Sequence, residues 1–229
     1  MPLITDIVAI DGPAGAGKSS VSRAVASRLG FAFLDTGAMY RAATWWAMHC
    51  GVDLDDAEAL AASTLSMPLK LRGEETSLRV FVDDQDITEA IRLPEVTERI
   101  RKLDAIPAVR EPLVQRQRKF AMMRPTVAEG RDMGTVVFPD AKCKIFMDAS
   151  LEIRVQRRAQ EMIKKGQHPD LDRLREAIHR RDESDRSRAV APLRKAEDAH
   201  MLDTTSMSIN EVVDTIVSLT KKAFAEPCR

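Results

Sequence analysis

A glycine-rich loop near the start of the chain constrains its fold more than any other stretch. Residues 12–19 read Gly-Pro-Ala-Gly-Ala-Gly-Lys-Ser and match the pattern G-x-x-x-x-G-K-S/T. An apolar run at 7–10 precedes the loop, and Val21, Val25 and Leu29 follow it at helical spacing. Such a strand, loop and helix can hold phosphate groups, because glycines turn backbone N–H groups inward and the helix start adds a partial positive charge. The alternative is a glycine-rich turn that only caps the helix.

Two side chains of this loop extend the phosphate hypothesis. Lys18 would bring a full positive charge to the β- and γ-phosphates of a nucleotide, and the Ser19 hydroxyl would hold Mg²⁺. Both roles belong to the P-loop pattern, in which these two residues directly follow the last glycine. We therefore expect a site for nucleotide phosphates at residues 12–19.

The composition narrows the classes of protein that remain. The chain has 229 residues, 44% of them hydrophobic and 31% charged, which is enough for one sizeable globular core. Its 35 basic and 35 acidic residues balance, so we expect no nucleic-acid partner and only a local anion site. Cys50, Cys143 and Cys228 are scattered, which predicts reduced thiols in a cytoplasmic protein. No apolar segment reaches 18 residues, so membrane insertion is not expected.

Strands and helices are expected to alternate along most of the chain. Short apolar runs predict five core strands, at 6–11, 31–34, 125–129, 144–148 and 200–203. The helical patterns between them indicate an α/β fold with a doubly wound parallel sheet and helices on both faces. In such sheets ligands lie beyond the carboxyl ends of the strands. The segments expected to gather there are the loop at 12–19, Asp35, Thr36, residues 130–132 and Asp148.

Residues 67–84 differ from this pattern and predict a small inserted subdomain. Two short runs, 69–71 and 78–82, alternate apolar with polar residues, and residues 73–76 between them favour a turn. Alternation of this kind is typical of an antiparallel hairpin with one buried face.

Further helices are expected around the insertion. Asp35 should cap a helix at 37–50 and Asp53 one that ends near residue 64, while 86–90 and 93–103 are helical in pattern. Pro107 begins another helix, and a last one at about 208–224 closes the core. The charged side chains of the helix from Pro107 are expected mostly on the solvated surface: Arg110, Arg116, Arg118 and Lys119.

Arginine recurs at helical spacing between residues 150 and 190. One face would carry Arg154, Arg157 and Arg158, and another Arg181, Asp185 and Arg188. Like charges on one face repel, so either water or a bound anion must compensate them. A solvated surface is one interpretation; beside a phosphate loop, forked guanidinium groups that match phosphoryl oxygens are the other. Residues 166–169 break the two helices, as a hinged lid would require.

Five stretches of the sequence form longer motifs, at 10–19, 34–41, 130–139, 144–149 and 181–188. The first identifies only a P-loop, whereas Gly-Arg-Asp-Met-Gly-Thr-Val-Val-Phe-Pro at 130–139 and the R-D-x-x-D-R-x-R run from Arg181 are far more specific. In these stretches the sequence closely resembles the bacterial cytidylate kinase family, also called CMP kinases. The resemblance implies a five-stranded parallel core, a lid and a nucleoside-monophosphate (NMP) subdomain with a small antiparallel insert.

The resemblance also implies a domain organisation and a reaction. One kinase domain would span 1–229, with its core at 1–36, 105–150 and 191–229, an NMP-binding subdomain at about 37–104 and a lid at about 151–190. ATP with Mg²⁺ would phosphorylate CMP, and also dCMP, by direct in-line transfer. We expect a monomer. The lid would close over the phosphates and exclude water that would otherwise hydrolyse ATP.

Site residues follow from the same resemblance, position by position. The ATP phosphates would be held by Gly12, Pro13, Ala14, Gly15, Ala16, Gly17, Lys18, Ser19 and Ser20, with Ser19 on Mg²⁺. CMP would be bound by Thr36, Arg41, Arg110, Arg131, Asp132, Arg181, Asp185 and Arg188; within this set Arg110 and Asp132 match cytosine contacts. The residues implied in catalysis are Lys18, Arg131, Arg157, Arg158 and Arg188.

Several positions keep a second interpretation. Arg101 stands where many family members have Ser at a position associated with the base, and Glu129 stands where Asp is common. Asp132 can instead be a helix N-cap, and for Asp35 a cap is the favoured role. Tyr40, the single tyrosine, can lie beside the acceptor phosphate or pack on its own helix face.

Two other functions fit parts of the pattern. A kinase for UMP, or for both pyrimidine nucleotides, would use the same loop and lid, and measured base preference separates it from a CMP kinase. A regulatory P-loop protein would bind ATP without turnover that depends on an acceptor. The arginine-rich lid and the second nucleotide site argue against the regulatory alternative.

Overall fold

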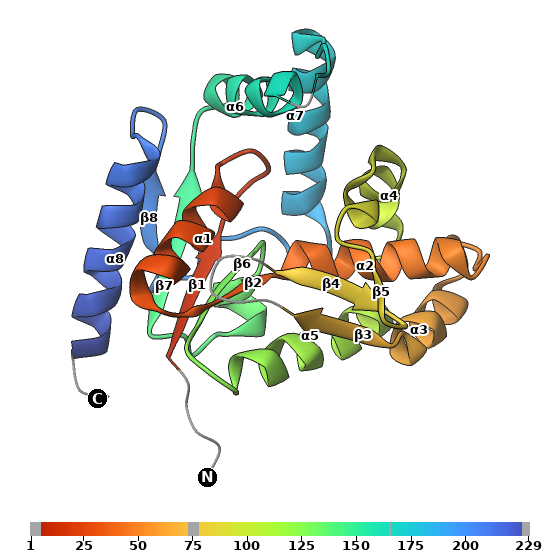
Figure 1. Cartoon of the computed structure of the whole chain (residues 1–229). Helices are drawn as coiled ribbons and strands as arrows, with labels where there is room; N and C mark the ends of the chain where they lie inside the picture. The colour runs from red at the N-terminus through yellow and green to blue at the C-terminus, as the bar shows by residue number, and fades with distance from the viewer. Residues whose placement is uncertain (1–5, 73–77, 165, 226–229) are drawn as a thin grey trace.

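The computed structural model describes residues 6–72, 78–164 and 166–225, and within them a parallel sheet forms the centre of the molecule (Figure 1). Its strands are β1 (Ile7–Asp11), β2 (Ala32–Asp35), β6 (Thr126–Gly130), β7 (Cys143–Asp148) and β8 (His200–Asp203), in the order β2-β6-β1-β7-β8. The five core strands expected from the sequence are therefore confirmed. So is the doubly wound α/β fold, because the strand order departs from chain order on both sides of β1.

Helices cover both faces of this sheet because its strands are apolar on both sides. Val8 and Ile10 of β1 pack with α1 (Lys18–Leu29) and α8 (Ile209–Ala225). Ala9 between them points to the opposite face, where α2 (Thr36–His49) and α5 (Pro107–Ala121) lie. No helix in the described part of the chain is long and apolar enough to cross a lipid bilayer.

Two further groups of elements project from the core (Figure 1). Helices α6 (Leu151–Lys164) and α7 (Leu171–Ser187) pack on each other beyond the carboxyl ends of the strands. On another side, β3 (Leu69–Arg72), β4 (Arg79–Val82) and β5 (Gln85–Asp86) form an antiparallel sheet near α3 (Ala57–Ser66) and α4 (Pro94–Arg99). The expected hairpin is confirmed and gains a third strand, while its turn at 73–76 lies outside the described residues.

Three helix predictions in this region need correction. Asp56, not Asp53, caps α3: its carboxylate accepts hydrogen bonds from the N–H groups of Glu58 and Ala59. Residues 86–90 are not a helix, because Gln85–Asp86 pairs with β4 and only a 3-10 turn follows, at Ala90–Arg92. The expected helix at 93–103 is divided into α4 and a second 3-10 turn, Ile100–Lys102.

The expected solvated surface of α5 was also wrong in part, because Arg110 is buried and only 5% exposed. The Arg116 guanidinium donates to the carbonyl oxygen of Leu65 at the end of α3. Arg118 donates to two carbonyl oxygens of the segment after β6. Helix α5 lies between α3 and the segment after β6, and its guanidinium groups donate to backbone carbonyl oxygens of both. Helical periodicity alone cannot predict such contacts.

One close approach anchors the phosphate loop to the sheet. Gly12 has a φ of 150°, and a Cβ at this position would collide with the carbonyl oxygen of Met147 in β7. Only glycine lets the backbone leave β1 so close to the neighbouring strand.

We expect Gly12→Ala to prevent folding or to destabilise the protein far more than Gly51→Ala. Gly51 also has a positive φ, of 68°, but a Cβ there meets nothing within 4 Å, so the strain alone should cost about 1–2 kcal/mol. Urea unfolding of both variants measures the difference. Equal losses would show that the contact with Met147 does not constrain the loop.

Candidate active site

The loop between β1 and α1 places Lys18 in the first turn of α1, beneath the carboxyl ends of the strands. Its Nζ donates hydrogen bonds to the carbonyl oxygens of Gly12 and Pro13, each at 2.7 Å. Burial, helped by the charge of Arg131, lowers the pKa of Lys18 to about 7. The loop therefore carries a buried amine at the edge of the sheet where ligands of α/β proteins bind.

Glu129, at the end of β6, faces the same loop. Its carboxylate accepts a hydrogen bond from the Ser19 hydroxyl, and burial together with the charge of Asp35 raises the pKa of Glu129 to about 7. One of its oxygens, Oε1, has no hydrogen-bond partner among the described residues. A hydroxyl and a carboxylate are the hard oxygen donors that suit Mg²⁺. No group of three or more His, Cys, Asp or Glu in the described ranges could hold a metal, so these donors would share the ion with phosphate oxygens.

Three arginine–aspartate pairs, each side chain at most 19% exposed, lie around this region: Arg110–Asp132, Arg131–Asp185 and Arg154–Asp182. We call them the three buried pairs. They join separate elements, since their arginines come from α5, the end of β6 and α6, and two of their aspartates come from α7. Charges buried in this way need partners, because desolvation costs several kcal/mol for each ion.

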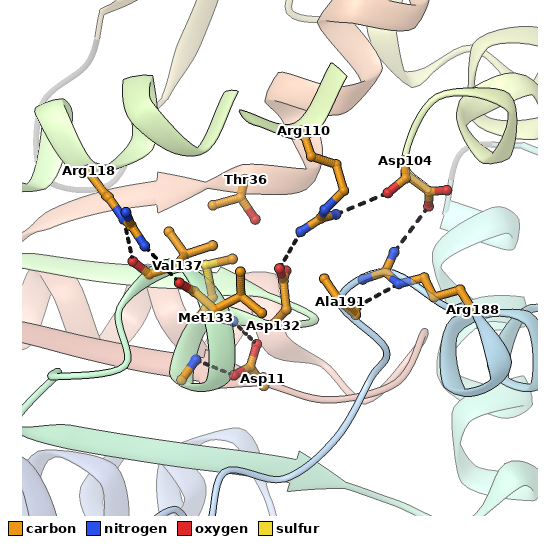
Figure 2. Close-up of polar contacts among 12 residues, drawn as sticks. Asp11, Thr36, Asp104, Arg110, Arg118, Asp132, Met133, Val137, Arg188 and Ala191 are labelled. Carbon is orange, nitrogen blue, oxygen red and sulfur yellow. Dashed lines mark hydrogen bonds and ion pairs between the residues drawn. The ribbon is translucent and has the colours of Figure 1, made fainter. Parts of the chain in front are cut away.

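The first pair rules out the cap interpretation of Asp132. Asp132 precedes a wide turn at Met133–Val137, but its side chain accepts no hydrogen bond from that turn. The Asp11 carboxylate of β1 accepts from the N–H groups of Met133 and Gly134 instead, each at 2.8 Å. The Asp132 carboxylate therefore faces the Arg110 guanidinium (Figure 2). Burial still raises the pKa of Asp132, although Arg110 opposes the shift.

The second pair joins β6 to α7. Arg131 Nε donates to Asp185 at 2.7 Å, and this guanidinium holds the pKa of Asp185 below its ordinary value even though burial raises it. Arg181, one turn earlier on α7, is half-buried close to Arg131. Burial, then the repulsion from Arg131, lowers the pKa of Arg181 to about 10. Two guanidinium groups thus lie close enough to repel each other, although Asp185, Glu129 and Asp182 raise the pKa of Arg131.

The third pair separates Arg154 from Arg157 and Arg158, the arginines that share its face of α6. Its guanidinium donates to Asp182 of α7, to Ala149 and to the Ala14 carbonyl oxygen of the phosphate loop. Arg154 thus ties the loop to both projecting helices. The sequence grouped it with Arg157 and Arg158 on one face, without indicating that it is buried.

The other two arginines of α6 differ in their surroundings. Arg157 donates to the carbonyl oxygen of Ala16 at 3.2 Å and to Thr204, so it lies beside the phosphate loop. Arg158 is exposed and pairs with Glu161 on its own helix. The structure therefore brings Arg157 to the loop but leaves Arg158 on the surface of α6.

Arg188 lies just after α7 and is held by two groups. Its Nε donates to the carbonyl oxygen of Ala191 at 2.7 Å, and its guanidinium lies 3.5 Å from the Asp104 carboxylate (Figure 2). The carbonyl of Asp104 also accepts from Arg110, at 3.0 Å. Asp104 therefore contacts both arginines, and burial raises the pKa of its carboxyl group.

The residues after β2 complete the site. Asp35 caps α2, accepting from the Ala38 N–H at 2.8 Å, and its carboxylate also pairs with Arg41 at 3.1 Å. The Thr36 hydroxyl donates to the Glu129 carbonyl oxygen at 2.7 Å. Tyr40 lies on α2 and is buried in the hydrophobic core, and the Arg110 guanidinium lies over its ring, 5.4 Å from the ring centroid. The packing interpretation of Tyr40 is thus confirmed, while its place beside an acceptor phosphate stays a prediction.

Three residues of the site carried too little sequence signal to be assigned. Asp11 ends an apolar strand just before the glycine loop, and a carboxylate so placed could have been suspected of a buried role. Asp104 and Asp182 lie in charged segments where acidic residues are unremarkable. Their partners are more than 25 residues away in the chain, except for the contact of the Asp104 carbonyl with Arg110.

The fold and this site define a P-loop protein with a second, arginine-rich region beside its phosphate loop. Comparison with known proteins agrees. A family model described as Cytidylate kinase matches residues 8–222. The chain belongs to the cytidylate kinase family, a family of nucleotide kinases.

Individual relatives match over nearly the whole chain. A protein named cytidylate kinase from Oceanobacillus iheyensis is 47% identical over 211 residues, which are 92% of each chain. Another from Aeromonas salmonicida is 42% identical over 99% of this chain and 98% of that protein. A bifunctional pantoate ligase/cytidylate kinase from a Synechococcus strain is 48% identical over 93% of this chain, which corresponds to 40% of that longer protein.

We expect Arg154→Ala to destabilise the protein by about 3 kcal/mol or more, because it leaves the Asp182 carboxylate buried without its ion-pair partner. Arg158→Ala on the same helix should change stability by less than about 0.5 kcal/mol, since that side chain is half exposed. Urea unfolding followed by circular dichroism compares the two. A small effect of Arg154→Ala would mean that the loop is not held through α6 and α7.

Proposed function

We propose that this protein transfers the γ-phosphoryl group of ATP to CMP, and also to dCMP, and releases ADP with CDP or dCDP. The observation that carries the proposal is the position of two different sites at one edge of the sheet. A phosphate loop with Lys18 follows β1, and the buried Arg110–Asp132 pair lies after the adjacent strand β6. A donor and an acceptor nucleotide bound at these sites would meet near the ends of the two strands.

On the donor side, residues Gly12 to Ser20 hold the ATP phosphates in this proposal. Lys18 exchanges the carbonyl oxygens of Gly12 and Pro13 for phosphate oxygens. Ser19, with Glu129 acting through water, would hold Mg²⁺, which when bound neutralises charge on the phosphates and orients them. Arg157, next to the Ala16 carbonyl, lies within reach of the same phosphates.

On the acceptor side, base recognition is assigned to the Arg110–Asp132 pair. The Asp132 carboxylate accepts from the amino group of cytosine, and Arg110 donates to the ring oxygen and nitrogen. Uracil has a carbonyl at the position of that amine, so its lone pairs would face the carboxylate and leave buried polar groups unpaired. Discrimination against UMP follows from this arrangement.

The phosphate and the ribose of CMP are assigned to the surrounding polar groups. Thr36, Arg41 and Arg131 contact the acceptor phosphate, Arg181 and Asp185 the ribose, and Arg188 the transferring group. The closeness of the Arg131 and Arg181 guanidinium groups supports this assignment, since a bound phosphate would relieve their repulsion. A phosphate oxygen of CMP attacks the γ-phosphorus in line, without a covalent enzyme intermediate. Guanidinium groups stabilise the charge that spreads over the equatorial oxygens.

The same proposal divides the chain by role. The core comprises 1–36, 105–150 and 191–229, the NMP-binding subdomain about 37–104, and the lid about 151–190. Closure of α6 and α7 brings Arg157, Arg158 and Arg188 over the phosphates and excludes water. Arg158 is exposed and paired with Glu161 here, so it would have to leave that partner on closure. We expect a monomer acting in the cytoplasm, in keeping with free thiols at Cys50 and Cys143.

The function is tested by an assay of ADP release with CMP, dCMP, UMP and AMP as acceptors. Turnover with CMP and dCMP well above that with UMP and AMP is expected. Equal turnover with CMP and UMP would indicate a kinase for both pyrimidine nucleotides. ATP binding without turnover that depends on an acceptor would indicate a regulatory protein.

Lys18→Ala should leave the protein folded and lower turnover with CMP by at least about a hundredfold, because the charge on the β- and γ-phosphates loses its partner in the transition state. Lys221→Ala, on the exposed side of α8, is the matched control and should retain full activity. Near-normal turnover in a folded Lys18→Ala protein would contradict the assignment of Lys18 to the ATP phosphates.

Asp132→Asn should narrow the ratio of kcat/KM for CMP over UMP, because an amide can donate to the uracil carbonyl. A loss of about 1–3 kcal/mol in preference is typical of one removed polar contact. Arg101→Ser should leave the ratio nearly unchanged, since Arg101 is exposed and a guanidinium can only donate. If Arg101→Ser changes the ratio and Asp132→Asn does not, base recognition is assigned to the wrong residue.

A further inference from the structure

The wide turn at Met133–Val137, called here the 133–137 turn, determines where the Asp132 carboxylate lies. The N–H groups of Val136 and Val137 donate to the Asp132 carbonyl oxygen at 2.9 and 3.1 Å. The Phe138 N–H donates to Met133 at 2.7 Å. Asp132 is thus the first residue of a hydrogen-bonded unit, and any displacement of the turn moves its side chain.

A carboxylate from the centre of the sheet holds the start of this turn. Asp11 accepts from the N–H groups of Met133 and Gly134 with one oxygen each. Asp11 therefore takes the place of the usual N-cap, and the Asp132 side chain remains available to face Arg110.

A guanidinium holds the other end of the turn. Arg118 Nε donates to the Val137 carbonyl oxygen and Arg118 Nη2 donates to that of Val136, both at 2.9 Å (Figure 2). Carbonyl groups at the end of a helical turn lack partners within it, and the fork of an arginine supplies two donors in one plane. The turn is therefore held at both ends by charged side chains from other elements.

Arg118 and Arg110 belong to the same helix, α5, and are about two turns apart. At one point α5 contacts Asp132 through the Arg110 guanidinium, and at the other it contacts the turn that follows Asp132 through Arg118 (Figure 2). The second contact fixes the distance between the helix that carries Arg110 and the backbone that carries Asp132. A base that must meet both side chains needs that distance held.

We propose that Arg118 is a positioning residue for base selectivity, which acts by holding the 133–137 turn, opposite Asp11, so that Asp132 and Arg110 face the acceptor base together. This inference rests on the proposed function, in which that pair recognises cytosine. In this proposal Arg118 contacts only backbone carbonyl oxygens, those of Val136 and Val137, and is assigned no contact with either nucleotide. It differs in this respect from every residue assigned above to CMP or ATP.

The test compares Arg118→Ala and Arg118→Lys with Arg116→Ala, in the full chain. Arg116 is the matched control, because it is a guanidinium of the same helix that donates to a carbonyl oxygen, that of Leu65, far from the 133–137 turn. For each variant kcat and KM are measured with CMP, UMP and ATP, and the unfolding midpoint in urea is determined. Arg118→Lys keeps one donor and serves if Arg118→Ala does not fold.

In Arg118→Ala we expect the CMP-over-UMP ratio of kcat/KM to fall by about tenfold, a size in keeping with misplacement of a recognition group. The KM for CMP should rise, while the KM for ATP stays within about twofold of the wild type. Arg118→Lys should recover part of the CMP-over-UMP ratio. Arg116→Ala should lower the unfolding midpoint but leave the CMP-over-UMP ratio unchanged.

Other outcomes overturn the proposal. An unchanged CMP-over-UMP ratio in a folded Arg118→Ala or Arg118→Lys protein shows that the turn needs no such support. Equal changes of the ratio in the Arg116 and Arg118 variants show that only general stability is involved. If the wild-type protein itself phosphorylates no nucleotide, or does not prefer CMP, the proposed function fails first, and that result is distinct from either of these.

Discussion

Compensation of buried charge is the constraint on which this structure depends. A site that receives the phosphates of two nucleotides must hold several cations out of water, and each would cost several kcal/mol if left alone. The three buried pairs and the Arg188–Asp104 contact supply partners for four arginines. Their aspartates come from α7, from the segment before α5 and from the end of β6. The projecting helices are thus held to the core by the ion pairs of the candidate site.

Much of the fold could be predicted because its signals are local. Apolar runs and the glycine loop located all five core strands, and alternation located the inserted hairpin. The errors arose where two neighbouring residues offered the same chemistry or where pairing decided the outcome. Asp53 and Asp56 are both good N-cap residues, and the cap is Asp56 because α3 begins at Ala57. Residues 85–86 became a strand because β4 offers an open edge.

Less of the site's internal organisation could be predicted. The motifs located Lys18, Arg131, Asp132 and Asp185, which indeed gather at one edge of the sheet. Which arginine meets which carboxylate depends on contacts between distant segments, such as Arg154 with Asp182, and these have no local pattern. The contacts of Asp11 and Arg118 could not be predicted for another reason: their partners are backbone groups, which every residue has.

The protonation of the Lys18 amine would make nucleotide affinity depend on pH. Its hydrogen-bond partners are two neutral carbonyl oxygens, and burial lowers its pKa to about 7, although the Glu129 carboxylate opposes the shift. In the proposed function a phosphate oxygen would take their place and favour the charged ammonium, so the pKa of Lys18 would rise when nucleotide binds. At neutral pH a fraction of the empty molecules must then take up a proton as the nucleotide enters. Affinity for the nucleotide would therefore weaken as the pH rises above 7, because binding then requires the uptake of a proton that the free amine no longer carries.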